Sequence, residues 1–464
     1  MKNYSLLFFS LAALVLFGCN NRSEHSDGKE THKSFTGAKG EVRLMTLDPG
    51  HFHAALIQKV MHEQMNPVVH VFAPNGPDIE AHCDRINHFN TRIDNPTSWK
   101  LELYKEPDFF EQMISRKPGN LMNISGNNAK KTEYILKTVE AGINVIADKP
   151  MVISPEEFPK LEKAFIVAEQ NGVLLYDVMT ERYEITTIVQ RALSRMPDVF
   201  GEIVMGSVDE PAISKESTHH FFKRVAGKPL VRPAWFFDTQ QQGEGLVDVT
   251  THLIDLIQWE TFPEVMLFKK DVEIISSNRW TTDLTPTMFN NVTQLSEYPK
   301  YLYKDLKDSL LMVYCNGEIN YTLKGVHAKA SVQWNYQAPE GTKDTHRSVM
   351  RGTKSDLIIE QGEKEKYIST LYIVSKSNQL HDHELQQSIK KLSATYPGIT
   401  LNQIEESKWT LNIPDKYKVG HEAHFGQVTE KYLGFLRDGK LPKWEVPNMI
   451  TKYHTTTQAL KIAK

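Results

Sequence analysis

One stretch in the middle of the chain carries acid–base side chains at helical spacing. In GEGLVDVTTHLIDL, Asp248, His252 and Asp255 stand at positions i, i+4 and i+7, which places all three on one face of a helix. A histidine has a pKa near ambient pH, so His252 could take or give a proton. An apolar stripe one residue further on would let the helix bury one side and present the other to a cleft. A solvated charged face is the alternative interpretation of this spacing.

A lysine closes a second, apolar stretch, NVIADKP. The apolar run predicts a buried parallel strand, and Lys149 ends it just ahead of Pro150. Ligands of α/β proteins bind beyond the carboxyl ends of parallel strands, so a lysine there could hold a substrate oxygen as negative charge develops on it. The alternative is a lysine that caps the strand at the protein surface.

The order of apolar runs predicts the elements that would bring these stretches together. From residue 42, strand-like runs (VRLMTL, VVHVFA, LELY, NLMNIS, NVIADKP, VLLYDV) alternate with amphipathic or polar stretches such as AALIQKVMHEQM, 77–89, 129–140 and 155–170. This alternation is typical of βαβ units with a mainly parallel sheet. Beyond about Pro197, longer strands joined by turns such as Asn316-Gly317 predict an antiparallel sheet, with helices near 245–259, 384–392, 424–436 and 449–462.

Composition excludes several classes of protein. The chain has 464 residues, 40% hydrophobic and 24% charged, as in a globular protein of two to three domains. With 54 basic and 57 acidic residues the net charge is −3, so we predict no nucleic-acid binding. The three cysteines are too scattered for a disulfide framework. His219-His220 and the pair His421 and His424 lack a third ligand at a diagnostic spacing, so we predict no metal site.

The N-terminus predicts an export signal. Residues 1–18 contain the apolar run LLFFSLAALVLF, which is too short for a permanent membrane helix. The next sequence, LFGC, resembles the lipobox of bacterial lipoproteins, which implies cleavage before Cys19 and lipid on its sulfur. We therefore expect a lipid-anchored protein of the bacterial cell envelope, in the periplasm or at the outer membrane, with a flexible tether over 19–40. A cleaved signal with an incidental cysteine is the alternative.

Three stretches together resemble the Gfo/Idh/MocA oxidoreductase superfamily. AGINVIADKPM is similar to the family's strand that ends in Glu-Lys-Pro, GEGLVDVTTHLIDL to its pattern GGxxxDxxxHxxD, and LDPGHFHAAL stands where the family has its dinucleotide loop. The chain is similar to a secreted Bacteroidetes-type branch with its own C-terminal oxidoreductase domain. The resemblance implies an α/β fold: a Rossmann-like dinucleotide-binding domain over 41–180, then an α+β substrate domain over 181–464 with a mostly antiparallel sheet and returning C-terminal helices.

The resemblance implies NAD or NADP as cofactor. It implies that the cofactor contacts the opening loop, the loop SGNNAKK and the strand-end lysine. The residues are Gly50, His51 and His53 in the first loop, Ser125 and Asn127 in the second, and Lys149. It also implies a homo-oligomer, because the antiparallel sheet of this family often supports dimers or tetramers.

The opening loop departs from the family's pattern. Asp48 and Pro49 replace flexible residues, and Pro49 lacks a backbone N–H that could bind phosphate. The expected acidic residue after the second strand is missing, and Asp78 could bind the ribose only if its loop bends back. A scaffold that has lost its cofactor is therefore an alternative.

In the resembled family the matching Lys, Asp and His line the active site. For hydride transfer from an alcohol carbon, His252 would accept the hydroxyl proton and Lys149 would hold the oxygen. Asp248 would bind an adjacent hydroxyl or orient the site.

Three further residues are predicted to bind substrate. Arg182 aligns with a family arginine, Asp255 completes the helix motif, and the ring of Trp235 could stack on a sugar. A structural salt bridge is the alternative for Arg182, and core packing is the alternative for Trp235.

These features favour a nicotinamide-dependent oxidoreductase acting on a sugar or glycoside. One variant is redox-neutral glycoside cleavage with a captive NAD, which would suit a compartment without a free nicotinamide pool. Two alternatives from other classes are a lipid-anchored carbohydrate-binding protein on a cofactor-free scaffold, and a hydrolase or lyase that uses His252 and Asp248 directly.

The lipobox resemblance predicts that Cys19→Ala moves the protein from the membrane to the soluble periplasmic fraction, because the lipid anchor is lost. Fractionation followed by mass spectrometry of the N-terminus checks this. Unchanged membrane partitioning without lipid mass would contradict it.

Overall fold

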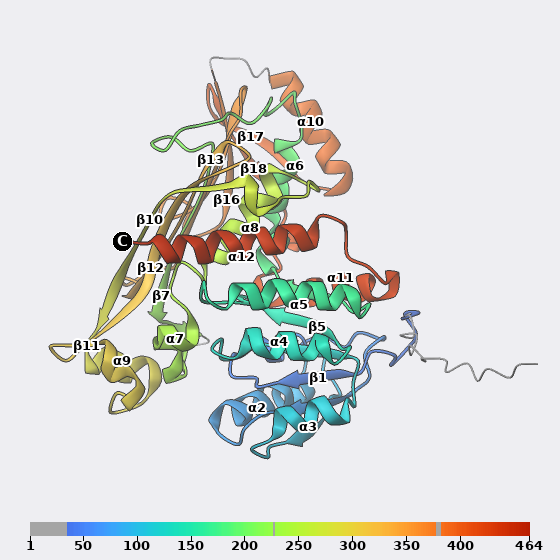
Figure 1. Cartoon of the computed structure of the whole chain (residues 1–464). Helices are drawn as coiled ribbons and strands as arrows, with labels where there is room; N and C mark the ends of the chain where they lie inside the picture. Colours follow the sequence, from blue (N-terminus) through green and yellow to red (C-terminus); the bar gives the residue numbers. More distant parts are fainter. Residues whose placement is uncertain (1–34, 226–227, 377–381) are drawn as a thin grey trace, which may run out of the picture. The chain divides into compact units, whose positions relative to one another are not determined.

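The first half of the chain is a parallel α/β unit. The computed structural model describes residues 35–225, 228–376 and 382–464, so Cys19 and the predicted signal lie outside the described residues. Six parallel strands form a sheet in the order β3-β2-β1-β4-β5-β6 (Figure 1). The strands are β1 (Leu44–Leu47), β2 (Val68–Phe72), β3 (Lys100–Tyr104), β4 (Leu121–Ile124), β5 (Asn144–Asp148) and β6 (Leu175–Val178). The helices are α1 (His53–Leu56), α2 (Pro77–Thr91), α3 (Phe109–Arg116), α4 (Lys131–Glu140) and α5 (Phe158–Gln170).

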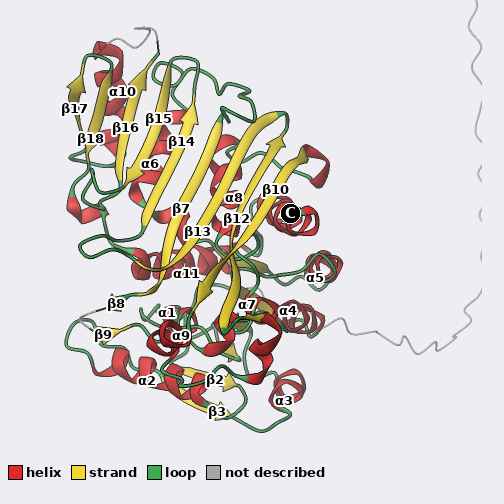
Figure 2. Cartoon of the chain, turned by 90° about the vertical axis from the view of Figure 1, so that its left-hand side faces the viewer, coloured by secondary structure: helices red, strands yellow, loops and turns green. Residues whose placement is uncertain are grey.

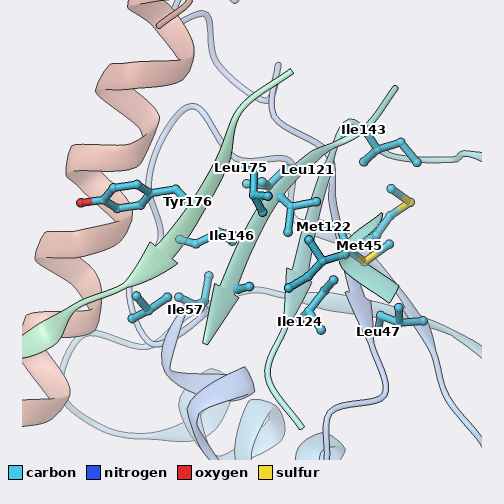
Figure 3. Close-up of a cluster of buried hydrophobic side chains, with 14 of the residues drawn as sticks. Met45, Leu47, Ile57, Leu121, Met122, Ile124, Ile143, Ile146, Leu175 and Tyr176 are labelled. Atoms are coloured by element: carbon cyan, nitrogen blue, oxygen red, sulfur yellow. The ribbon is translucent and has the colours of Figure 1, made fainter. Parts of the chain in front are cut away.

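Four strands of this sheet, including β6 at one edge, are buried along their whole length. All residues of β1, β4, β5 and β6 are buried, which is why they read as continuous apolar runs and not as alternating ones. Figure 3 shows part of the core they form, in which Met45, Met122 and Leu175 share one face of the sheet and Ile146 lies on the other. A sheet covered on both faces places its functional groups at the strand ends.

One expected helix is much shorter than its sequence pattern. The stretch AALIQKVMHEQM contributes only the single turn of α1. The carbonyl oxygen of Gln58 accepts a hydrogen bond from Trp99 Nε1 at 2.6 Å, and that of Lys59 accepts one from Arg92 Nη2 at 2.6 Å. Side chains from distant elements therefore take the backbone acceptors that a longer helix would use.

The second half is built on a ten-stranded sheet. Its order is β10-β12-β13-β7-β14-β15-β16-β18-β17, with β11 beside β12, and every pair is antiparallel except β13 with β7. The strands are β7 (Ile213–Phe222), β10 (Val272–Leu284), β11 (Leu306–Lys307), β12 (Leu310–Leu323), β13 (Val326–Gln337), β14 (Thr345–Arg351), β15 (Ser355–Gln361), β16 (Thr370–Ser375), β17 (Thr400–Glu405) and β18 (Lys408–Asn412). A short hairpin of β8 (Arg224–Val225) and β9 (Lys228–Pro229) stands apart. The predicted fold class is confirmed.

Helices cover one face of this sheet, while Figure 2 looks onto the other face. They are α6 (Ile185–Ser194), α8 (Thr250–Thr261), α10 (Asp382–Thr395) and α12 (Glu445–Ile462), while α7 (Thr239–Gln242), α9 (Pro286–Thr293) and α11 (His421–Asp438) lie elsewhere. Short 3-10 turns occupy Thr180–Tyr183 (η1), Ala234–Phe237 (η2), Lys269–Asp271 (η3), Lys300–Asp305 (η4) and Asp415–Tyr417 (η5). In the part of the chain described, no helix is long and apolar enough to cross a membrane.

The C-terminal helices return to the parallel sheet. The Tyr432 hydroxyl on α11 lies 3.1 Å from the carbonyl oxygen of Val145 and 3.0 Å from that of Leu174. Helix α12 contacts α5 of the first half and α8 of the second. The last forty residues therefore pack against both halves.

A buried ion-pair network joins four elements: η1, α8, α12 and β6. Arg182 in η1 donates from Nε and Nη2 to both oxygens of Asp255 on α8, at 2.6 and 2.7 Å, and from Nη1 to Glu445 on α12 at 3.0 Å. Lys452 on α12 bridges Asp255 at 2.8 Å and Asp177 on β6 at 2.6 Å. All five side chains are buried, so every charge depends on its partners.

This network corrects two sequence-based assignments. Arg182 and Asp255 were expected to bind substrate, but their polar atoms are engaged with each other and with Glu445 and Lys452. Burial alone would raise the pKa of Asp255, yet Arg182 and Lys452 hold that pKa well below its usual range. We therefore assign both residues a structural role.

Replacing Asp255 by Asn should destabilise the protein by roughly 3–5 kcal/mol, because Arg182 and Lys452 lose a buried counter-charge. The pKa of the folded carboxyl is depressed, so its contribution is complete at neutral pH. The contribution shrinks as pH falls below about 4, the ordinary carboxyl value.

Urea unfolding at pH 7 and at low pH measures this difference. Glu140→Gln removes an exposed pair with Lys163 and serves as the control, with an expected cost of about 1 kcal/mol or less. Equal effects of the two substitutions at pH 7 would contradict the structural role.

Candidate active site

The first feature of the site is an ion pair between the two halves of the chain. Lys149 directly follows β5, and its Nζ lies 2.5 Å from Asp248 Oδ1. Asp248 stands two residues before α8, and its second oxygen accepts a hydrogen bond from Gln242 Nε2 at 3.0 Å. Both side chains are almost buried, with 11% and 8% exposure. The strand-end lysine and the helix carboxylate that the sequence singled out therefore meet.

His252 lies one helical turn beyond Asp248 and belongs to the same cluster. It is partly exposed, and among the described residues its Nδ1 has no hydrogen-bond partner. Burial, helped by Lys149 and His421, holds the pKa of His252 well below its ordinary value. The imidazole is therefore neutral at physiological pH and has a lone pair with which to accept a proton.

A second cluster lies at the adjacent strand ends. His53, the first residue of α1, places Nδ1 3.0 Å from Asp148 Oδ2, and His51 Nδ1 lies 3.7 Å from the same oxygen. Lys131 is buried and donates to the main-chain oxygen of Asp148 at 3.1 Å. Burial would raise the pKa of Asp148, but the neighbouring His53 and Lys131 lower it overall.

The ten-stranded sheet contributes charged side chains that the sequence patterns did not single out. Asp344, in the loop before β14, lies 2.9 Å from His220 Nδ1 and 3.4 Å from His219 Nδ1 on β7. Burial lowers the pKa of His219, and the cations Lys223 and Lys149 add to this effect. Arg232 is buried with its guanidinium 5.2 Å from the Trp334 ring centre. No sequence spacing links Asp344 or Arg232 to the motifs.

The loop after β4 binds the second half of the chain through its side chains. Asn127 Nδ2 donates to Gln241 Oε1 at 2.6 Å, and Asn128 Nδ2 donates to the Gln242 carbonyl at 2.7 Å. Ser125 Oγ donates to Asn123 Oδ1 at 2.9 Å. Ser125 and Asn127 were predicted to contact cofactor, but these side-chain donors form hydrogen bonds within the protein. Asn127 and Asn128 thereby fix α7, whose last residue Gln242 orients Asp248.

A separate cavity of about 520 Å³ opens at the carboxyl ends of β1 and β2. Its lining includes Asp48, Gly50, Asp78, Arg85 and Trp235. The strand order reverses between β1 and β4, and α/β sheets bind ligands beside such a reversal. The cavity is therefore a second candidate binding region, separate from the Lys149 cluster.

Trp235 closes this cavity from the second half of the chain. Its Nε1 donates to Asp78 Oδ2 at 3.1 Å, and a Cβ added at Gly50 would meet that oxygen at 2.9 Å. Trp235 was expected to stack on a sugar, but the structure places it against the Gly50 loop. Asp78 lies in the cavity because α2 begins at Pro77, directly before it.

The chain is similar to known proteins in sequence and in fold. Residues 189–464 match the family model described as "Putative oxidoreductase C terminal domain". The chain is similar to a crystal structure of "a putative oxidoreductase" from Parabacteroides merdae, with 54% identity, a TM-score of 0.91, and coverage of 93% of this chain and 99% of that chain. No curated protein matches in sequence.

Two more distant structures share the fold alone. The 3-ketoreductase KijD10 from Actinomadura kijaniata, in complex with NADP and TDP-benzene, has 12% identity, a TM-score of 0.55, and coverage of 91% of this chain and 98% of that chain. Biliverdin reductase from Synechocystis, in complex with biliverdin and NADP⁺, has 13% identity, a TM-score of 0.54, and coverage of 91% and 99%.

Proposed function

Because the chain belongs to the Gfo/Idh/MocA-type oxidoreductases that carry the "Putative oxidoreductase C terminal domain", we propose that it oxidises a hydroxyl-bearing carbon of a sugar or glycoside with NAD or NADP as hydride acceptor. The contact of Lys149 with Asp248, with the unpartnered nitrogen of His252 one turn away, carries this proposal. The ion pair lies at the end of a parallel strand, and we propose that a substrate hydroxyl binds between Lys149 and His252.

The cavity at β1 and β2 fits the ribose end of a dinucleotide. Asp78 offers a carboxylate of the kind that binds ribose hydroxyls, and Arg85 offers a cation suited to a 2′-phosphate. The absent side chain of Gly50 leaves the backbone open to close approach, since a Cβ there would touch Asp78. The sequence had indicated that the acidic ribose contact is missing, and Asp78 is a candidate for it.

The same region offers few groups that could bind a pyrophosphate. The helix after β1 is a single turn, Pro49 has no N–H, and Asp48 takes the place of a loop glycine with φ 46°. Burial and the neighbouring Asp78 raise the pKa of Asp48 to about 6. We therefore propose that the cofactor is held mainly at its ribose end and binds weakly when added from solution.

When bound, NAD(P) would supply the acceptor for a hydride from the alcohol carbon. His252 would take the hydroxyl proton. Lys149 donates to the same oxygen, and its positive charge stabilises the alkoxide as the proton leaves. Asp248 keeps the ammonium group in place, and Gln242 fixes the carboxylate.

We also propose a lipid anchor at Cys19 and a cell-envelope location. Such a compartment lacks a free nicotinamide pool, so redox-neutral glycoside cleavage with a captive cofactor is the form of the reaction that suits it. The sugar oxidised in the first step would then be reduced again in the last.

Lys149→Ala should lower turnover by roughly 10²–10³-fold, since it removes charge stabilisation that grows in the transition state. His252→Ala should lower it by roughly 10²–10⁴-fold through loss of the base. The measurement is kcat on a panel of glycosides and free sugars, with product and reduced cofactor both followed.

Two exposed residues provide matched controls for these variants. Lys137→Ala and His88→Ala remove the same side-chain types from α4 and α2 and should leave turnover unchanged. Folded Lys149 and His252 variants with wild-type turnover would show that the active site lies elsewhere.

A further inference from the structure

We propose that His51, His53 and Asp148 form a binding site for one divalent transition-metal ion, with an open coordination position toward Lys149 and His252. The three side chains each bring one ligand atom within 4.8 Å of the others. The sequence analysis predicted no metal site, and this proposal departs from that prediction. It goes beyond the proposed hydride transfer, because ion binding at these residues requires neither cofactor nor substrate.

The distances are those of a site close to its metal-bound geometry. With metal–ligand bonds of about 2.0–2.2 Å, ligand atoms at tetrahedral or octahedral angles lie about 3.0–3.5 Å apart. Asp148 Oδ2 is 3.0 Å from His53 Nδ1 and 3.7 Å from His51 Nδ1. Only a small movement of His51 is required. That movement would break the 3.3 Å hydrogen bond that His51 Nδ1 accepts from the backbone N–H of His53.

Two lysines lie near the site, yet neither donates a hydrogen bond to the side-chain carboxylate of Asp148. Lys149 is bound to Asp248, and Lys131 donates to the main-chain oxygen of Asp148. Among the described residues, the Asp148 side chain has a hydrogen bond only with His53. Its oxygens are thus available to an ion, whereas the two ammonium groups already have acceptors.

The protein holds two of the three ligands, Asp148 and His53, in fixed positions. Asp148 ends the buried strand β5, and His53 opens α1 with 9% of its side chain exposed. The His53 ring packs against Phe425 of α11 at a centroid distance of 4.6 Å, and the His421 ring lies 5.6 Å away. His51 remains 18% exposed, so the site has an accessible side.

Two histidines and one carboxylate suit zinc, iron, cobalt or manganese, and such sites keep positions open for substrate. An ion here would bind a sugar hydroxyl or carbonyl oxygen as a Lewis acid. It would act beside Lys149 on the same developing negative charge. The ligand class is therefore an oxygen-rich substrate with vicinal oxygens.

The test is titration of the chelator-stripped full-length protein with Co²⁺ and Zn²⁺, by calorimetry and by the visible spectrum of bound Co²⁺. One ion per chain is expected. His53→Asn and Asp148→Asn should weaken binding by on the order of 10²-fold or more, since even loss of an outer contact costs 10–100-fold. His88→Asn, on the exposed side of α2, is the matched control and should bind as wild type.

Three results separate this proposal from the hydride-transfer function. Absence of stoichiometric binding, or binding that survives both ligand substitutions in folded protein, would overturn the metal site. A Lys149→Ala variant should keep the ion, and loss of turnover in that loaded variant leaves the metal proposal intact. The Co²⁺ spectrum of the wild type must show nitrogen and oxygen ligation even where a ligand variant fails to fold, and its absence would also overturn the site.

Discussion

The ion pair between Lys149 and Asp248 is the contact on which the candidate site depends. It joins the end of a parallel strand to the entry of a helix in the other half of the chain, at 2.5 Å and with little exposure. A nearly buried charge that loses its partner is strongly destabilising, so each side chain fixes the position of the other. The loop after β4, α7 and Gln242 extend this contact into a continuous hydrogen-bonded support.

The rest of the architecture serves to hold that junction. Arg182, Asp255 and Lys452 tie the end of the parallel sheet to α8 and α12, so the helix that carries His252 is fixed at its far end as well. Around the junction, the ammonium groups of Lys149 and Lys131 lie near His51, with the carboxylates of Asp148 and Asp248 beside them. Cations in this position can stabilise negative charge on a bound oxygen, which is the requirement shared by hydride transfer and by metal-assisted chemistry.

Sequence reasoning located the elements that carry the site because local patterns encode them. Helical spacing indicated that Asp248 and His252 face the same way, and a buried strand ending in Lys149 indicated where a ligand would bind. It did not identify the partners of Arg182 and Asp255, since Glu445 and Lys452 arrive on a helix nearly two hundred residues beyond Asp255. Asp344 comes from a loop without any pattern. The pairing of His53 with Asp148 joins positions 95 residues apart, which only the order of strands β1, β4 and β5 brings together.

Hydride transfer from a sugar carbon is tested most directly with glycosides deuterated at single ring carbons. The protein is denatured within the first turnover of an accepted substrate, before a final reduction can return the hydride to the sugar. The released nicotinamide cofactor is then weighed by mass spectrometry. Transfer predicts one deuterium on the cofactor for the label at a single ring carbon, and none for labels elsewhere. Turnover of every labelled substrate with an unlabelled cofactor, or with no cofactor released at all, would contradict an oxidoreductase that works through Lys149 and His252.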